Sequence, residues 1–276
     1  MEPSQVRHAV EAARSMALEL GLQVNDAGVV HNSDRIAVRL VPCDVLVRIG
    51  PQAWEDGFQF EVEVARRLAE KGSPVGKLEP RVEPCVYRRD TFALTLWTYY
   101  EQVGAVPPND YADALIRLHE GLRQLNLVAP HINARVAAWV EEVNDSKQNP
   151  ELPSPDRERL SDTFKRVRNE MSQWSTVDQL LHGEPHPGNV LNTSAGPLFI
   201  DFHTCQRGPI EYDLAYIPEE AAAHYPGASP HLVHQFRTLK WAGFTTMRWR
   251  SGDQFPDRDR WRVEGLRQLQ AALSRA

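Results

Sequence analysis

The sequence predicts an α+β fold with a small, β-rich N-terminal lobe and a larger, mainly helical C-terminal lobe. Short β-like segments dominate the N-terminal part, and an aromatic and β-branched run at 91–100 is its strongest strand signal. Gly104 and the Pro107-Pro108 pair then interrupt the pattern, as expected of a hinge. Helical periodicity prevails beyond that point. We therefore expect two lobes, at 1–104 and 105–276.

The composition is that of an ordinary globular protein. The 276 residues, 42% of them hydrophobic, are enough to bury a substantial core. The formal net charge of −6 argues against a nucleic-acid binder, which normally carries a basic excess or stripe. The three cysteines show neither a disulfide framework nor a metal-binding spacing. No signal peptide and no membrane-spanning run is visible, so we expect a cytoplasmic protein without a membrane partner.

The N-terminal lobe should begin with a helix whose apolar residues recur at helical spacing and which Gly21 ends. Pro42-Cys43-Asp44 is typical of a hairpin turn between two strands. The expected segments are a helix at 3–20, strands at 29–30, 35–40 and 44–50, a helix at 53–71, irregular chain with strand-like pieces at 75–90, and the strand at 91–100.

The C-terminal lobe should contain helices at 109–126, 134–143 and 154–174, short strands at 189–193 and 197–201, and three more helices from Tyr212 onward. Asn109 or Asp110 is the expected cap of the first of these helices. The sequence SPDRE at 154–158 is typical of a capped helix start.

One stretch, residues 180–216, concentrates polar groups between two apolar runs, with Gly and Pro at its turns. Glu184 is followed five residues later by Asn189, and Asp201 lies at the end of the next strand pair. A nucleotide-dependent kinase needs a carboxylate beside the attacking hydroxyl, an amide or carboxylate oxygen for Mg²⁺, and a second carboxylate at the phosphates. The order and spacing of these three residues match a kinase catalytic loop and its metal-binding Asp.

HGEPHPGNVL, together with LFIDFHTCQRGPIEYDLA, resembles the aminoglycoside phosphotransferase and choline kinase-like family, relatives of the protein kinases. DVLVRIG resembles the family strand that carries a phosphate-binding Lys, with Arg48 at that position. EVEVARRLAEKGSPV resembles the helix that carries its partner Glu, which falls on Glu61, and LTLWTYYE resembles the strand that leads into the hinge. The resemblance implies a two-lobed protein-kinase-like fold, with the nucleotide bound by the N-terminal lobe.

The resemblance also implies the roles of individual residues. Asn189 and Asp201 would hold Mg²⁺, and Arg48, oriented by Glu61, would hold the phosphates of ATP, with GTP as the alternative. Glu184 would orient and deprotonate a hydroxyl of a small-molecule acceptor. The adenine would pack near Trp97–Val103. The family's acceptors include antibiotics with amino groups, amino alcohols and sugars, and an acidic pair, Glu219 and Glu220, favours a cationic acceptor.

Three departures from the family pattern support an alternative, a nucleotide-binding module with weak or lost kinase activity. Glu184 stands where the family has Asp, and Arg48 where it has Lys, which binds phosphate with a different geometry. No Gly-rich phosphate loop is visible; HNSDR occupies that turn, and Ser33 or backbone amides there would cover the phosphates. The sequence does not identify the acceptor or the oligomeric state.

Some polar residues also have structural interpretations. We expect His182 to hold the catalytic loop by hydrogen bonds, and Asp213 to act as a helix cap or a brace. Glu63 competes with Glu61 for the role of partner to Arg48. His182, Glu184 and His186 lack the H-E-x-x-H order of a zinc protease, and the Gly and Pro residues between them exclude its helix.

Overall fold

The computed structural model describes residues 3–33, 35–174 and 176–275, and it divides into two compact units. The first, here called the sheet unit, comprises Met1–Leu125 and Pro187–Thr204. The second, here called the helical unit, comprises Asn126–His186 and Cys205–Ala276. The functional division into lobes at 104/105 stays a prediction.

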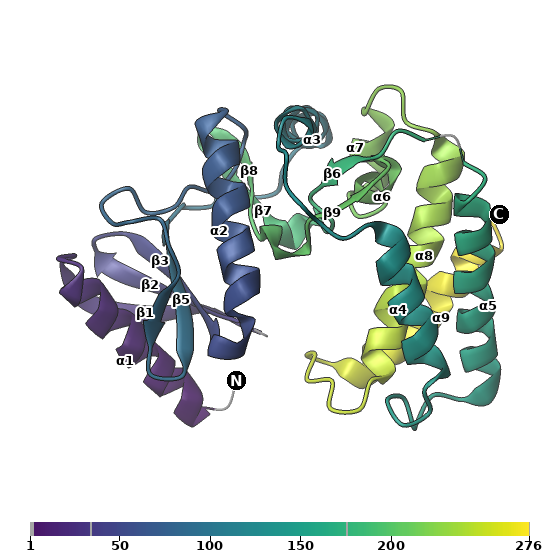
Figure 1. The fold of residues 1–276 in the computed structure, drawn as a ribbon, viewed down its shortest axis with the longest axis horizontal. Coiled ribbons are helices and arrows are strands. Elements are labelled where there is room, and N and C mark those ends of the chain that lie inside the picture. Colours follow the sequence, from purple (N-terminus) through teal and green to yellow (C-terminus); the bar gives the residue numbers. More distant parts are fainter. Residues whose placement is uncertain (1–2, 34, 175, 276) are drawn as a thin grey trace. The chain divides into compact units, whose positions relative to one another are not determined.

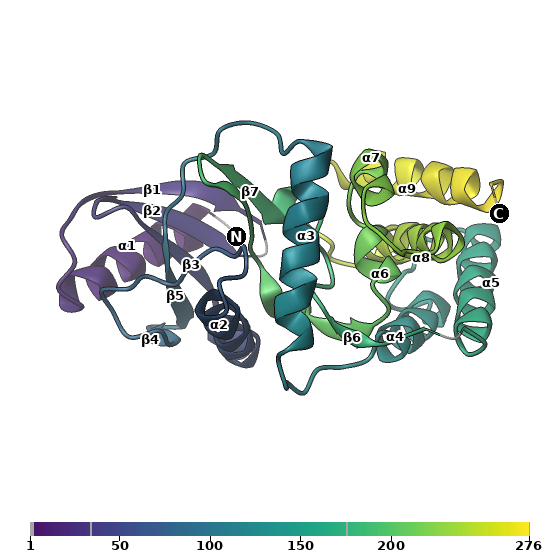
Figure 2. The ribbon, with the colours of Figure 1, turned by 90° about the horizontal axis from the view of Figure 1, so that it is seen from above.

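The sheet unit is built on a five-stranded antiparallel sheet with the strand order β1-β2-β3-β5-β4 (Figures 1 and 2). Its strands are β1 (Val24–Asn32), β2 (Ile36–Pro42), β3 (Val45–Pro51), β4 (Tyr87–Arg89) and β5 (Phe92–Thr98). The predicted hairpin turn is confirmed, because Leu40 of β2 pairs with Val45 of β3 across Pro42-Cys43-Asp44.

The alternation of side chains gives this sheet two different faces. Val38 and Val47 belong to the face that α1 (Pro3–Glu19) covers, where they are buried with alanines of that helix such as Ala13. Ala37, Leu46 and Arg48 alternate with these residues and line a cavity on the other face. One strand register thus places a buried core on one side and a polar site on the other.

A second helix, α2 (Glu55–Glu70), follows the 3₁₀ turn η1 (Gln52–Trp54). Apolar residues on its buried side, such as Phe58 and Leu68, are fully buried, and Glu61 is buried with them. A carboxylate without exposure requires charged or hydrogen-bonding partners, because burial of an unpaired charge is costly. The helix therefore fixes an acidic group inside the sheet unit.

The sheet unit also contains α3 (Pro108–Arg123) and a two-stranded hairpin. The hairpin and its flanking 3₁₀ turns are η2 (Pro187–Asn189), β7 (Val190–Thr193), β8 (Gly196–Phe199) and η3 (Phe202–Thr204). Phe199 packs edge to face on Tyr111 of α3, with ring centroids 6.0 Å apart. The predicted strand pair is confirmed, and β8 ends at Phe199, two residues before Asp201.

The predicted caps of two helices are wrong. Pro107 is the N-cap of α3 and Pro108 its first residue, so neither Asn109 nor Asp110 caps it. Proline suits the first helical position because its missing N–H would have no partner there and its φ is already helical. In α5 (Ser154–Met171) a proline, Pro153, is again the N-cap, and no side chain caps the helix.

The helical unit packs long helices around an apolar core (Figure 2). Its elements are α4 (Ile132–Asn144), α5, β6 (Gln179–Leu181), β9 (Gln206–Gly208), α6 (Glu211–Leu214), α7 (Glu219–Ala223), α8 (Pro230–Trp249) and α9 (Arg258–Leu273). Trp139 of α4 stacks on Phe164 of α5, with ring centroids 5.7 Å apart. Among the described residues, four helices rather than the predicted three follow Ile210, and the first two are short.

Hydropathy gives no sign of a bilayer crossing in the described part of the chain, where every helix is too short or too polar to span one.

Candidate active site

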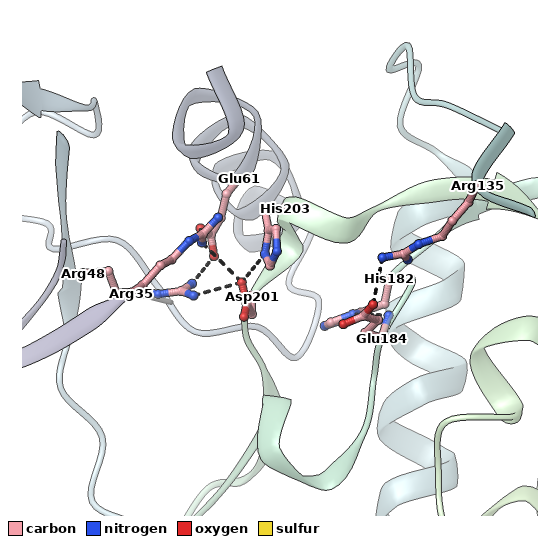
Figure 3. A network of polar contacts seen from close by, with 8 residues as sticks. All are labelled: Arg35, Arg48, Glu61, Arg135, His182, Glu184, Asp201 and His203. Carbon is pink, nitrogen blue, oxygen red and sulfur yellow. Dashed lines mark hydrogen bonds and ion pairs between the residues drawn. The ribbon is translucent and has the colours of Figure 1, made fainter. Parts of the chain in front are cut away.

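An ionic cluster in the sheet unit brings together three residues that the sequence singled out. Arg48 of β3 pairs with Glu61 of α2 through Nη1 and Oε1, and its Nη2 lies 2.9 Å from Asp201 Oδ1 (Figure 3). The competing Glu63 instead pairs with Arg66 and Arg67 on the surface of α2. The structure therefore joins strand, helix and post-hairpin Asp, segments far apart in the sequence, at one guanidinium.

Two further residues, Arg35 and His203, belong to this cluster, and neither was predicted from the sequence as a site residue. Arg35 Nη1 donates to Glu61 Oε2 at 2.8 Å and to Asp201 Oδ1 at 3.4 Å. His203 Nδ1 lies 2.5 Å from the same Asp201 oxygen. Arg35 is held further by Phe58, because its guanidinium carbon lies 4.5 Å from the centre of that ring. Glu61 thus receives one arginine on each oxygen.

The charges in this cluster stabilise one another. Burial alone would raise the pKa of Asp201, but the positive charge of Arg48 and the hydrogen bond from His203 lower it below its usual range. Burial opposes the charge of Arg48, and Glu61 and Asp201 outweigh it and raise the pKa of its guanidinium. Asp201 is therefore ionised at every pH at which the protein would work.

The cluster lines a cavity of about 790 Å³ within the sheet unit. Its wall includes Arg35, Arg48, Asn189 and Asp201 on the polar side. The predicted adenine segment contributes to the same wall with Trp97, Thr98, Tyr99, Tyr100 and Gln102. Ser33 lines it as well, and His31 Nε2 lies 3.0 Å from Ser33 Oγ. A cavity of this size with an aromatic side and a cationic side suits a nucleotide.

The donor set at Asn189 and Asp201 fits Mg²⁺. The recorded contacts of Asp201 with the described residues all use Oδ1, which leaves Oδ2 for a cation. Asn189 ends η2 and lies on the same cavity wall; its backbone carbonyl accepts from Ile200 at 3.0 Å, which ties it to the residue before Asp201. Mg²⁺ needs few protein ligands, since it takes one or two carboxylates together with substrate phosphates and water.

Glu184 lies in the helical unit, after β6. Arg135 of α4 donates from Nη2 to Glu184 Oε1 at 2.9 Å, and about a quarter of each side chain is exposed (Figure 3). Trp139, one turn further along α4, packs against Arg135, whose guanidinium carbon lies 5.4 Å from the centre of the Trp139 ring. The carboxylate is thus held in one direction and remains accessible to a ligand.

The loop around Glu184 is braced from within the same unit. Asp213 of α6 accepts from the backbone N–H groups of His182 and Gly183, each at 2.8 Å. His182 Nδ1 accepts from the backbone N–H of Glu184 at 3.3 Å. The expected bracing by His182 and Asp213 is confirmed, although Asp213 stabilises this loop rather than capping its own helix.

Comparison with known proteins identifies the family of this site. The model of the phosphotransferase enzyme family matches residues 30–250, which include the ionic cluster, the loop around Glu184 and the strands of the cavity. The chain belongs to the phosphotransferase enzyme family. The predicted family is therefore confirmed, and with it the prediction that the chain is an enzyme of the small-molecule kinase type. A search of curated protein sequences finds no match to this phosphotransferase.

Solved structures confirm the two-lobed protein-kinase-like fold of the phosphotransferase. The GDP complex of wild-type aminoglycoside 2'-phosphotransferase-IIIa is 15% identical, with a TM-score of 0.70 over 97% of this chain and 99% of that one. The amicoumacin kinase hAmiN, bound to AMP-PNP and Ca²⁺, is 11% identical, with a TM-score of 0.73 over 98% and 96%. The choline kinase LicA from Streptococcus pneumoniae is 11% identical, with a TM-score of 0.69 over 96% and 100%.

Proposed function

We propose that this phosphotransferase transfers the γ-phosphoryl group of ATP to a hydroxyl of a small molecule, with Mg²⁺ as the metal. The observation that carries the proposal is the cluster of Arg48, Glu61 and Asp201 on the wall of a cavity of about 790 Å³. Phosphoryl transfer depends mainly on positioning and on neutralisation of phosphate charge. A fixed guanidinium beside an ionised Asp supplies both.

Each residue of the site has a role in this proposal. Arg48 binds the phosphates and Glu61 orients it, while Ser33 and its neighbouring backbone cover them. Asn189 and Asp201 hold Mg²⁺, which neutralises phosphate charge during transfer. Trp97 and the chain to Val103 border the base. The sequence does not decide between ATP and GTP, and the related structures contain both kinds of nucleotide, GDP in one and AMP-PNP in another.

Glu184 is the proposed catalytic base, and it would accept the proton of the acceptor hydroxyl as that oxygen attacks the phosphorus. Its position five residues before Asn189 supports this role. Arg135 supports it too, because it restrains a side chain that is one methylene longer than the Asp of the family. On the family resemblance alone, the expected acceptors are antibiotics with amino groups, amino alcohols and sugars.

The change of Glu184 to Gln tests this role. We expect Glu184→Gln to lower kcat by at least ~10²-fold, because a positioned base contributes about that much or more. Its affinity for MgATP, measured by thermal shift, should stay within about threefold of wild type, since Gln keeps the size of the side chain. Wild-type turnover is first established by ADP release over a library of small alcohols. Full activity of Glu184→Gln would exclude the proposed base.

The alternative is a nucleotide-binding module with weak or lost kinase activity. One observation favours it: Asp201 Oδ1 already carries contacts from Arg48, Arg35 and His203, so a metal has to share an engaged carboxylate. Stabilisation by MgATP without ADP release on any alcohol would support this alternative. No stabilisation by any nucleotide would contradict both proposals.

A further inference from the structure

The surroundings of Glu184 in the helical unit are rich in positive charge. Arg135 binds Glu184 directly, at 2.9 Å. Lys240, on α8, donates to the carbonyl of Ala215 at 3.4 Å, two residues after Asp213, whose carboxylate holds the backbone just before Glu184. The charge of Glu184 also acts on its ammonium group. The two side chains come from different helices and share one carboxylate as their negative neighbour. The three groups together carry a net charge of +1.

Lys240 has no carboxylate partner among the described residues. Its Nζ donates to the backbone carbonyl of Ala215 at 3.4 Å and lies 5.3 Å and 5.4 Å from the ring centres of Tyr216 and Trp241. Burial and, to a smaller extent, the charge of Arg237 lower the pKa of Lys240 from 10.5 to about 8, while Glu184 opposes both effects. The protein thus maintains a half-buried ammonium group without a counter-ion of its own.

The acidic pair that favoured a cationic acceptor is engaged elsewhere. Glu219 Oε1 lies 3.1 Å from Arg237 Nη1, and Glu220 also acts on the charge of Arg237. Two thirds of the Glu219 side chain is exposed, so its charge is largely screened by solvent. Arg135 and Lys240, which the acidic pair does not neutralise, both repel an ammonium group.

We propose that Arg135 and Lys240 bind an anionic group of the acceptor, a carboxylate or a phosphate, and so direct a hydroxyl of the same molecule to Glu184. This inference rests on the proposed phosphotransferase function and names its substrate class. A guanidinium binds carboxylate and phosphate in a bidentate manner, and an ammonium group adds a point charge. A monoanion would bring the net charge of the place from +1 to zero. The rings of Tyr216 and Trp241, next to Lys240, provide an apolar surface for the carbon skeleton of the acceptor.

Four three-carbon alcohols test the charge requirement because they differ only at one carbon. Glycerate carries a carboxylate, glycerol 3-phosphate a phosphate, glycerol a hydroxyl, and 3-aminopropane-1,2-diol an ammonium group. The full chain has five lysines, so reductive ¹³C-methylation gives few NMR signals, and Lys240→Gln assigns the relevant one. Each alcohol is titrated into the methylated protein in the presence of MgADP, and the shift of the Lys240 signal is followed.

We expect glycerate, glycerol 3-phosphate or both to move the Lys240 signal and to raise the pKa that it reports. Glycerol and the amine should leave it in place. Arg135→Gln should lower the affinity for the anion by roughly tenfold or more, as the loss of a charge-assisted hydrogen bond predicts. Lys240→Arg, which keeps the charge, should retain anion binding. The matched surface changes Lys147→Gln and Arg168→Gln, both at exposed positions, should have no effect.

The outcomes separate the two proposals. If the amine or glycerol binds as tightly as the anions, or if neither anion moves the Lys240 signal, the anionic subsite is wrong. The ratio of glycerate to glycerol 3-phosphate affinity distinguishes a carboxylate site from a phosphate site. Thermal stabilisation by MgATP is measured on the same sample. Its absence contradicts the proposed phosphotransferase function, whereas stabilisation with an unmoved Lys240 signal contradicts the anionic subsite alone.

Discussion

Arg35 and Glu61 lie 26 residues apart in the chain and meet at 2.8 Å, Nη1 to Oε2, inside the sheet unit. The opposite oxygen of Glu61 belongs to Arg48. A buried carboxylate bound by two guanidinium groups is fixed in both position and direction, because each group restrains one oxygen. Glu61 is thus the structural centre of the cationic side of the cavity.

Removal of the Glu61 charge should destabilise the sheet unit. Glu61→Gln leaves Arg35 and Arg48, with only 12% and 14% of their side chains exposed, to share Asp201. Breaking a buried ion pair by removal of one partner costs about 3–5 kcal/mol, so we expect a loss of about 3 kcal/mol in the free energy of unfolding. Urea denaturation measures it. Glu63→Gln, on the exposed side of the same helix, should cost less than about 1 kcal/mol. If Glu61→Gln and Glu63→Gln lower the free energy of unfolding equally, Glu61 does not hold the two arginines as described.

Arg35 should contribute to nucleotide affinity. It lines the cavity beside Arg48, so Arg35→Gln removes a positive charge from the side where the phosphates would lie. A hydrogen bond to a charged group contributes about 1.5–3 kcal/mol, and 1.4 kcal/mol corresponds to a factor of about ten in Kd. We expect the Kd of MgATP, measured by calorimetry, to rise by about tenfold or more. Arg66→Gln on the surface of α2 is the control. Unchanged affinity in Arg35→Gln would assign this arginine to folding alone.

The unfolding free energy should depend on pH through Lys240. Its pKa is about 8 in the folded chain and 10.5 in the absence of burial. Between these values the unfolded chain binds the proton and the folded chain does not, so stability rises with pH across this window. Below about pH 8 both states carry the charge, and the folded state bears its full burial cost.

The matched variant for this test is Lys240→Met, which removes the titrating group and keeps an unbranched chain. We expect its stability advantage over wild type to be constant below about pH 8 and to shrink towards about pH 10.5. Urea unfolding of both proteins at about pH 7 and about pH 10 measures the change. A difference independent of pH would show that burial and the charge of Arg237 do not hold the pKa of Lys240 down to the expected extent.

The elements of the sheet unit could be predicted because period-two alternation and turn residues specify them. Val38 and Val47 alternate with Ala37 and Arg48, so the residues of the two sheet faces can be assigned from the sequence. Arg48, Glu61 and Asp201 were predicted from motifs whose spacing is specific. The structure brings these three together, and their roles in nucleotide binding stay predictions.

The other charged residues at these two places could not be predicted in the same way. Arg35 follows the turn that suggested Ser33 as a phosphate contact, but a lone arginine in a turn is usually exposed to solvent. Arg135 and Lys240 lie on two helices that are distant in sequence, and each shows only a charged residue within a helix. His203, two residues after Asp201, had the best signal, since it directly follows the I-D-F motif. Long-range pairing of single charged residues leaves no periodic trace in the sequence.

The contacts of the Asp213 carboxylate affect how this chain tolerates substitution at position 213. It holds two consecutive backbone N–H groups, those of His182 and Gly183, and Gly183 has a φ of +95°, which favours glycine. The backbone that leads into Glu184 is therefore held by a residue on α6 that lies 29 positions further along the chain. We expect a replacement at 213, even by an isosteric Asn, to shift the proposed base without any contact of residue 213 with a substrate. A position of this kind would alter which alcohols are accepted while leaving the composition of the pocket unchanged.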